Sequence, residues 1–581
     1  MNTTKKQNLI LCVCSFAINA ILFLFNIAFY NCVFATNDDY RMSLIVSGAY
    51  TGEPSDTLVF MKYPIAWLLS SLYKITAGIP WYGIFTMLCI FIPSCLICFF
   101  ILRETSKSKY PATGILLYLL FYLFIVQKHV ILPQFTLTAA FMACAWLLLI
   151  WYMPNEKGTL YLIGSGIFAA IAFSIRMKVF LMIVPVAVLI VIIKLMKEVH
   201  RSKKYILKYV ISAVITILLC GTSQFCDVVK TDSEYKDFNT ARSLVYDFGA
   251  LPPYDANKQY YDSVGIDETL FYDISARYLD LDGGITTEKL RSVDSYNKEL
   301  ANSTPAYERL INAFFASSTY FLQESIIYQT IFVFILLVIA VFAAYRKKKY
   351  FFMAIPLCTL AGMFLEMTYL CYISRVMDRL TEVFLLAIAI ACIIALNAVL
   401  VSRTDANPSK TFERYSKIWI RVCKTVSIAC ILCVGVCLII SNQNAVTEKS
   451  KTQNLINSRL EVLNRFSAND KDSFYFYDAY DFIAASSDVF AVYDSMVNTD
   501  SLGNWYVNSP DYFKRNAKYG ITNSIDGLTD GNKNIYYAAI GNLKNGITLT
   551  MKERYNMEPI IVKTIPYENN NIYIYTFIPC G

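Results

Sequence analysis

The chain has 581 residues, of which 56% are hydrophobic, with a mean hydropathy of +0.44. Soluble domains contain roughly 45–50% apolar residues, and the excess here lies in long runs, so a polytopic α-helical membrane protein is predicted. The net charge of +8 does not indicate nucleic-acid binding, because Lys and Arg collect beside apolar runs, as in cytoplasmic loops. Most of the seventeen cysteines lie inside apolar segments, so neither a disulfide framework nor a zinc site is predicted.

The first apolar run, residues 9–34, is longer than the apolar region of a signal peptide and predicts a retained first span. Lys5 and Lys6 precede it, which places the N-terminus in the cytoplasm and residues 35–81 outside as a first external loop. Residues 35–62 are predicted to be a polar loop. Residues 64–78 are amphipathic but too short to cross, so a helix in the outer membrane interface is expected there.

Ten further runs are each near the ~20 residues that a bilayer core requires, which gives about eleven transmembrane helices. They are predicted at 82–102, 111–126, 132–152, 159–175, 178–196, 205–225, 322–345, 350–371, 379–401 and 420–441. The loops that alternation places inside carry most of the Lys and Arg, and the C-terminus then falls outside. The pairs within 111–152 and 159–196 have short connectors, and losing one span there would reverse everything that follows.

Four parts follow from this topology. They are an N-terminal transmembrane module (1–226), an external and mainly helical insertion (227–321), a C-terminal transmembrane module (322–441) and an external α/β domain (442–581). Helices are expected at 233–246 and 286–299, and strands at 473–477, 534–538, 560–562 and 572–575. The C-terminal region has no glycine-rich phosphate loop, HExxH pair or GxSxG elbow.

Two adjacent carboxylates, Asp38 and Asp39, follow the first span at the predicted outer surface. Other ionisable residues fall at the same outer ends of spans: Arg41, Lys128, His129, Arg176, Lys178, Arg375, Asp378 and Arg379, with Glu366 inside a span toward that side. An ionisable residue at membrane depth costs about 2.5–3.5 kcal/mol and is a functional candidate. The competing interpretations are a hydrated loop for the acid pair, headgroup snorkelling for Lys128 or Lys178, and an interfacial role for His129.

Acids facing several cations at a lipid–water boundary suit glycosyl transfer from a polyprenyl phosphate. The isoprenoid stays in the bilayer while an acceptor hydroxyl arrives from outside. Asp38 or Asp39 would take the hydroxyl proton as general base. Arg176, Lys178, Arg375 and Arg379, with Lys128, would hold the phosphate and stabilise its developing charge; Arg41, His129, Glu366 and Asp378 are candidate supporting residues.

The chain resembles the GT-C superfamily of membrane glycosyltransferases, which use polyprenyl-phosphate sugars. The likeness rests on residues 37–40 (NDDY), on 174–181 (SIRMKVFL) running to Pro185, and on 374–379 (SRVMDR). It implies a catalytic carboxylate in the first external loop, amphipathic helices beside it and a soluble external domain. Some members use a divalent ion and others do not. Asp38-Asp39 is not a DxD motif, so a requirement for Mg²⁺ or Mn²⁺ is left open.

Within that superfamily the chain looks like enzymes of the bacterial envelope. This implies a multi-pass protein of the bacterial cell membrane, an undecaprenyl-phosphate monosaccharide donor, inversion at the transferred sugar and a glycan or glycopolymer acceptor. Two alternatives stay open, a lipid-linked glycan polymerase or ligase and a transporter or flippase. The external domains are expected to hold the acceptor, with ordinary core packing as the competing role for the aromatic residues Tyr254, Tyr260, Tyr261, Trp505 and Tyr506.

Overall fold

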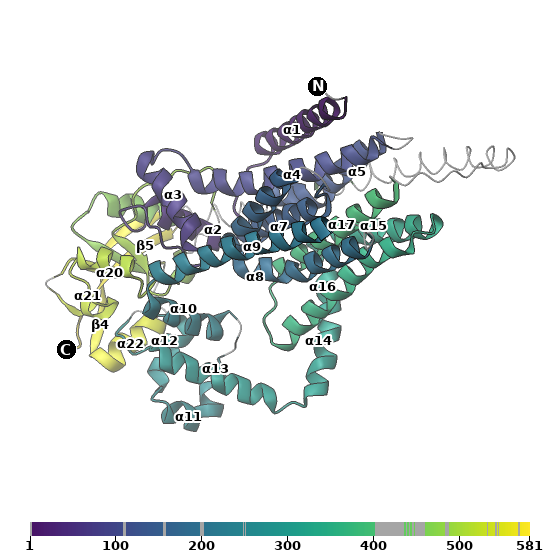
Figure 1. Ribbon diagram of the computed structural model, residues 1–581. Coiled ribbons are helices and arrows are strands. Elements are labelled where there is room, and N and C mark those ends of the chain that lie inside the picture. The colour runs from purple at the N-terminus through teal and green to yellow at the C-terminus, as the bar shows by residue number, and fades with distance from the viewer. Residues whose placement is uncertain are drawn as a thin grey trace, which may run out of the picture.

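The computed structural model describes residues 3–581 except 108–111, 155–157, 198–202, 248, 250, 280, 401–434, 437–438, 441, 444–446, 448–458, 483–486, 532, 541–542, 544 and 568–569. Figure 1 shows an elongated helical bundle with the C-terminal sheet domain at one end of it. Helices from the middle of the chain lie beside that domain and return to the bundle. The predicted span 420–441 falls mostly outside the described residues, so the count of eleven spans stays a prediction.

The bundle is built from long apolar helices. They are α1 (Thr3–Phe29), α4 (Trp81–Thr105), α5 (Ala112–Phe121) continuing through η1 (Tyr122–Val126) into α6 (Gln127–Ile131), α7 (Phe135–Trp151), α8 (Thr159–Lys197), α9 (Lys203–Lys230), α15 (Ile327–Arg346), η2 (Tyr350–Met353) leading into α16 (Ala354–Tyr372), and α17 (Asp378–Leu400). In the described part of the chain, eight helical segments are long and apolar enough to cross a membrane, and α7 is a shorter apolar helix. The protein is therefore a multi-pass membrane protein, as its composition predicted.

Helix α8 contains two of the predicted spans, because it folds back on itself at Arg176. This residue has φ −153° and ψ 91°, which is not helical. The rings of Phe173 and Phe180 lie 5.9 Å apart, whereas seven residues of straight helix rise about 10 Å. Lys194 donates to the carbonyl of Trp151, 2.5 Å away, so the end of α8 returns to the end of α7 from which it started. Arg176 thus lies at a turn, as the predicted short connector requires.

Helix ends gather into two groups. At the first, which we call the site end, Tyr82 and Phe135 at the starts of α4 and α7 both contact Asp39. Lys62 pairs with Asp227 near the end of α9 at 3.0 Å at the same end.

The opposite end, called the far end, is held by aromatic and amide contacts. Phe100 stacks on Tyr152 with ring centroids 4.2 Å apart, and Asn397 donates to the Tyr152 hydroxyl at 2.9 Å. Lys347 reaches the carbonyl of Val399. Phe100, Tyr152, Lys347 and Asn397 lie near or just beyond the C-terminal ends of α4, α7, α15 and α17, so these four helices all finish at the far end.

Two helices form the core of the bundle. All residues of α7 are buried, and α17 is buried over almost its whole length. A helix that is apolar on every side is expected in such a position. Both carry alanines, for example Ala139, Ala143 and Ala387, which allow neighbouring helices to approach closely.

The first external loop contains more structure than predicted. Residues Asn37–Ser47 form α2 and Tyr63–Ile75 form α3. A helix is therefore present where an interfacial one was expected, and its place in the interface stays a prediction, while the prediction of a polar loop at 35–62 is partly wrong. Most of α2 is buried, because it packs under the C-terminal domain. Ser43, for instance, donates to the Tyr493 hydroxyl. A sequence window cannot reveal burial by a domain 450 residues away.

The insertion is helical, as predicted. It contains α10 (Ser233–Tyr246), α11 (Tyr254–Ser263), α12 (Glu268–Ala276), α13 (Thr287–Asn302) and α14 (Ala306–Phe321). The side chains of Asp232, Asp267 and Thr286 cap α10, α12 and α13. Such caps satisfy free backbone N–H groups and fix where a helix begins, which is why the predicted starts were close.

The C-terminal domain is an α/β unit, as predicted. Its sheet has the order β2-β1-β3-β5-β4, from β1 (Phe474–Tyr477), β2 (Thr499–Ser501), β3 (Ile535–Ile540), β4 (Met557–Tyr567) and β5 (Asn570–Pro579). Strand β1 is parallel to β2 and β3, and β5 is antiparallel to β3 and β4. The short helices α19 (Ala479–Phe482), α20 (Pro510–Ala517), α21 (Ser524–Thr529) and α22 (Asn545–Tyr555) complete it. Four strands were predicted, and the short β2 was not.

Candidate functional site

The acid pair lies in the first turn of α2, at the site end of the bundle. Thr36 precedes the helix with extended backbone angles, and Asp38 and Asp39 are the acids of the first turn. Carboxylates are favoured there because backbone N–H groups at a helix N-terminus carry partial positive charge. The two side chains leave the helix in different directions and have different surroundings.

Asp39 is completely buried and hydrogen-bonded. The Tyr82 hydroxyl and the Phe135 backbone N–H donate to its Oδ1 at 2.9 and 3.1 Å, and the Thr36 hydroxyl donates to Oδ2 at 3.2 Å. Burial raises the pKa of Asp39 to about 7, although the bond from Tyr82 opposes this. Asp39 therefore ties the start of α2 to α4 and α7.

Asp38 is the accessible member of the pair. Its Oδ2 lies 3.1 Å from Nη1 of Arg379, and 14% of its side chain is exposed. Arg379 belongs to the first turn of α17, 341 residues further along the chain. The contact brings the carboxylate predicted as a candidate base against a cation predicted as a phosphate ligand.

Two guanidinium groups share one aromatic ring beside this pair. Arg176 lies 4.9 Å and Arg379 lies 5.6 Å from the centre of the Phe135 ring. Arg176 also lies 5.1 Å from the ring of Phe60, which stacks on Phe135 with centroids 5.4 Å apart. Stacking on aromatic faces stabilises like-charged guanidinium groups close to one another.

Two further cations extend this group. Lys178, exposed just after the turn of α8, is within electrostatic reach of Arg176 and Arg375. Arg375 lies in the short segment before α17. We call Arg176, Lys178, Arg375 and Arg379 the cation cluster. Arg379 and Arg176 thus lie beside Asp38, and Lys178 and Arg375 extend the cluster from Arg176.

The fifth predicted phosphate ligand, Lys128, lies in an adjoining pocket of about 180 Å³ that Arg379 also lines. Its Nζ is 2.5 Å from Glu382 and also donates to the carbonyl of Ser325. Gln134 lines the same pocket, and its buried Nε2 has no partner in the described part of the protein. Lys128 is therefore engaged with the Glu382 carboxylate in a pocket that Arg379 also lines.

Of the four candidate supporting residues, His129 and Asp378 line the same small pocket as Lys128 and Arg379, whereas Arg41 and Glu366 do not line it. Arg41 points away from Asp38 and donates to the Tyr477 hydroxyl of the C-terminal domain. His129 is buried against Phe141 in the wall of the smaller pocket. Asp378 accepts from Gln323.

Glu366 belongs to α16 and is half-buried. Its Oε2 is buried without a hydrogen-bond partner among the described residues. The contacts of the acid pair and of the cation cluster do not include it, so it stays a predicted supporting residue.

Sequence reasoning missed three residues that position the site: Tyr82, Phe60 and Phe135. Tyr82 follows Trp81 at the start of a span, where aromatic residues are common, so nothing distinguished it. Phe135 acts through its backbone N–H and its ring, and neither contact leaves a pattern in the sequence.

Metal ligation was left open, and the described residues contain no group of three or more His, Cys, Asp or Glu side chains placed to hold an ion. Asp38 meets Arg379 and Asp39 meets neutral donors. The role of a divalent ion stays untested.

The chain matches no protein-family model and no curated protein. Two solved structures align with 97% of it and with 97% of their own chains. They are ArnT from Cupriavidus metallidurans bound to undecaprenyl phosphate (8% identity, TM-score 0.40) and the same protein in the apo state (9% identity, TM-score 0.39). At these identities and TM-scores the similarity carries no argument about fold, substrate or chemistry.

Proposed function

We propose that this protein is a membrane glycosyltransferase that moves a monosaccharide from a polyprenyl phosphate to a cell-envelope glycan at the outer face of the membrane. The observation that supports this most is the contact of Asp38 with Arg379, beside the other three cations at one end of an apolar bundle. A cluster of cations attracts a phosphate, and a neighbouring carboxylate attracts a hydroxyl. Few reactions at a membrane surface require both a bound phosphate and a bound hydroxyl group.

In this proposal Asp38 is the general base. The acceptor hydroxyl attacks the anomeric carbon, its proton passes to Asp38, and the bond to the phosphate oxygen breaks with its electron pair on the phosphate. The charge that develops there is stabilised by Arg176 and Arg379. Attack from the face opposite the phosphate inverts the configuration of the sugar.

Arg379 links the two halves of this reaction. One of its N–H groups meets Asp38, and a guanidinium has five donors in all. An incoming phosphate competes for this cation and loosens its hold on Asp38. The Asp38 oxygen is then available to the acceptor hydroxyl when the donor is in place.

Asp39 is assigned a positioning role. Both of its oxygens already accept hydrogen bonds from Tyr82, Phe135 and Thr36, and its side chain is fully buried. An acceptor hydroxyl would have to displace these donors to reach it. Asp38 has no comparable obstruction.

A transporter is the alternative from another class. Transporters bind their cargo near the membrane midplane, whereas the acid pair and the cation cluster lie at one end of the bundle. A polymerase or ligase that uses a lipid-linked glycan would share this site and differ in its donor.

The test is made in the cells that carry the gene. Deletion is expected to remove one sugar from the envelope glycans and to cause its polyprenyl-phosphate form to accumulate, as measured by mass spectrometry of hydrolysed envelopes and of lipid extracts. Wild-type protein restores the sugar, and Asp38→Asn at equal protein level does not. Glu461→Gln, an exposed carboxylate outside the site, restores it. Full restoration by Asp38→Asn would overturn the assignment of Asp38 and favour transport.

A further inference from the structure

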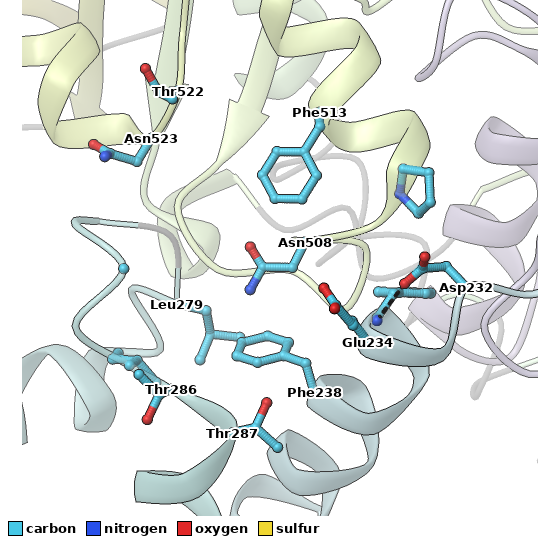
Figure 2. Close-up of a pocket in the computed structure, with 14 residues that line it drawn as sticks. Asp232, Glu234, Phe238, Leu279, Thr286, Thr287, Asn508, Phe513, Thr522 and Asn523 are labelled. Carbon is cyan, nitrogen blue, oxygen red and sulfur yellow. Dashed lines mark hydrogen bonds between the residues drawn. The ribbon is translucent and has the colours of Figure 1, made fainter.

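A groove of about 690 Å³ lies between the helical insertion and the C-terminal domain. Figure 2 shows that its two walls come from different parts of the chain, with Phe238 of α10 on one side and Phe513 of α20 on the other. Its volume falls within the range of about 300–1,000 Å³ that is typical of ligand pockets. It is separate from the smaller pocket beside Lys128.

Aromatic faces and uncharged polar groups line this groove. Phe513 has 47% of its surface exposed, which is unusual for so large an apolar ring beside a buried one such as Phe238. Asn508 projects between the two walls (Figure 2), and its amide has no hydrogen-bond partner among the described residues. Thr287 likewise leaves its hydroxyl available in the described structure. An exposed ring flanked by free amide and hydroxyl groups matches a sugar ring, which has an apolar face and a polar edge.

The charge of the groove limits what can bind there. Among the described residues that line it, the charged groups are the carboxylates of Asp232 and Glu234, with no Lys or Arg. Asp232 is engaged in capping α10 through the Tyr235 N–H, while Glu234 is exposed. A polymer with phosphate groups in its backbone would be repelled, whereas a glycan without charge would not.

A short chain of contacts joins the groove to the cation cluster. The hydroxyl of Tyr235, which lines the groove, donates to the carbonyl of Trp505 at 2.8 Å. The Trp505 ring lies 5.3 Å from the ring of Phe60, and Arg176 lies 5.1 Å from the centre of the same Phe60 ring. Tyr235, Trp505 and Phe60 therefore form a continuous path of contacts from the groove to Arg176.

We infer that this groove binds an uncharged acceptor glycan, with pyranose rings stacked on Phe513 and their hydroxyl groups bonded to Asn508, Thr287 and Glu234. The inference rests on the proposed function and narrows its acceptor to a glycan that carries no phosphate. Phe513 here takes the sugar-stacking role that the sequence analysis considered for other aromatic residues. Of those residues, Tyr254, Tyr261 and Tyr506 are buried, and Tyr260 stacks on Tyr296.

Binding is measured by saturation-transfer NMR on the full-length protein in nanodiscs. The probes are uncharged oligosaccharides of six pyranose units and a hexamer of glycerol phosphate. The oligosaccharides are expected to bind and the glycerol phosphate hexamer is not. Phe513→Ala is expected to weaken oligosaccharide binding at least tenfold, while Phe513→Trp preserves it because the stacking face remains. Tyr272→Ala, an exposed aromatic of the insertion outside the groove, serves as the matched control and leaves binding unchanged.

Three outcomes overturn the inference: no oligosaccharide binds the wild-type protein, the glycerol phosphate hexamer binds better, or Phe513→Ala binds as wild type. Each of these outcomes leaves the proposed function intact as long as the Asp38→Asn variant fails to restore the envelope sugar in the deletion strain. Conversely, if Asp38→Asn restores the sugar while Phe513→Ala loses binding, the groove binds a glycan and the assignment of the reaction fails.

Discussion

Asp38 and Asp39 are neighbours in the sequence with the same side chain, and their surroundings give them different properties. Asp39 is enclosed by Tyr82, Thr36 and the Phe135 N–H, and Asp38 faces Arg379. The sequence identified the pair and the four cations of the cluster beside it. It could not divide the roles, because a shift of one residue along a helix turns a side chain by about 100°, and only packing decides which direction is buried.

Substitution of Asp39 is expected to affect folding more than chemistry. Asp39→Ala leaves the Tyr82 hydroxyl and the Phe135 N–H unpaired in a buried place, which costs about 1–3 kcal/mol for each donor. Asp39→Asn keeps an oxygen acceptor for both and is expected to be close to wild type. Thermal unfolding in detergent measures the difference, and equal midpoints for the Ala and Asn variants would contradict the positioning role.

The raised pKa of Asp39 gives stability a pH dependence of known sign. Its ordinary value is 3.8 and burial raises its pKa to about 7 in the folded protein, so the folded state keeps a proton that the unfolded state has already lost between these values. The contribution of this carboxyl to stability is complete below pH 3.8 and is lost as the pH rises toward 7.

Comparison with Asp39→Asn isolates this effect. The free energy of unfolding of the wild type relative to the variant is expected to fall between pH 4 and 7, and to level off above that range. Denaturant unfolding across the pH series measures it. A difference that stays constant, or that rises with pH, would show that Asp39 is ionised in the folded protein.

At the scale of elements, a close approach between α4 and the C-terminal domain depends on glycine. A Cβ added at Gly83 would lie 1.8 Å from the carbonyl oxygen of Val489. The neighbouring residue Asp488 forms a bridge with Val33, so this contact holds the domain against the site end. A methyl group cannot be accommodated without moving the backbone of one partner.

Gly83→Ala is therefore expected to lower stability by about 1–3 kcal/mol through overpacking, although alanine favours helix more than glycine does. Gly78→Ala is the matched control, since a Cβ there meets nothing within 4 Å. Thermal unfolding of both variants tests this. If Gly83→Ala is as stable as Gly78→Ala, the domain is not docked through this contact.

The elements themselves were largely predictable, and the exceptions have physical causes. Long apolar runs and capped helices such as α10 are determined by local sequence, and the first ten predicted spans correspond to segments of the described bundle. The burial of α2 and the pairing of β2 depend on residues far along the chain. The reversal inside α8 was predicted from Arg176 and Lys178 between two apolar runs, because two adjacent spans require a turn between them.

For the whole molecule, a buried ion pair within the C-terminal domain binds Tyr50 of the first external loop. Arg515 and Asp500 are both fully buried and 2.5 Å apart. Asp500 also accepts from the Tyr50 hydroxyl of the loop at 2.7 Å, and Arg515 lies over the Tyr50 ring. The loop that carries Asp38 and Asp39 is thus braced by a domain that begins more than 400 residues later.

Removing one partner of such a pair leaves an uncompensated buried charge. Arg515→Ala is expected to destabilise the protein by about 3–5 kcal/mol. Its neighbour Lys514 also bridges to the loop, through Glu53, but both of those side chains are exposed, so Lys514→Ala should leave the unfolding midpoint unchanged. Equal midpoints for the two variants would show that the buried pair does not hold the domain.

The central claim, that Asp38 acts as the base beside the cation cluster, is tested most directly by transfer with purified protein in detergent. The lipid extract of the deletion strain supplies the donor and its envelope glycans supply the acceptor. Wild type is expected to move the missing sugar to the glycan, and Asp39→Asn is expected to transfer it at a rate near that of wild type. The transfer rate of Asp38→Asn is expected to be lower by about 10²–10⁴-fold, the usual contribution of a general base. Transfer by Asp38→Asn at the wild-type rate would contradict the account.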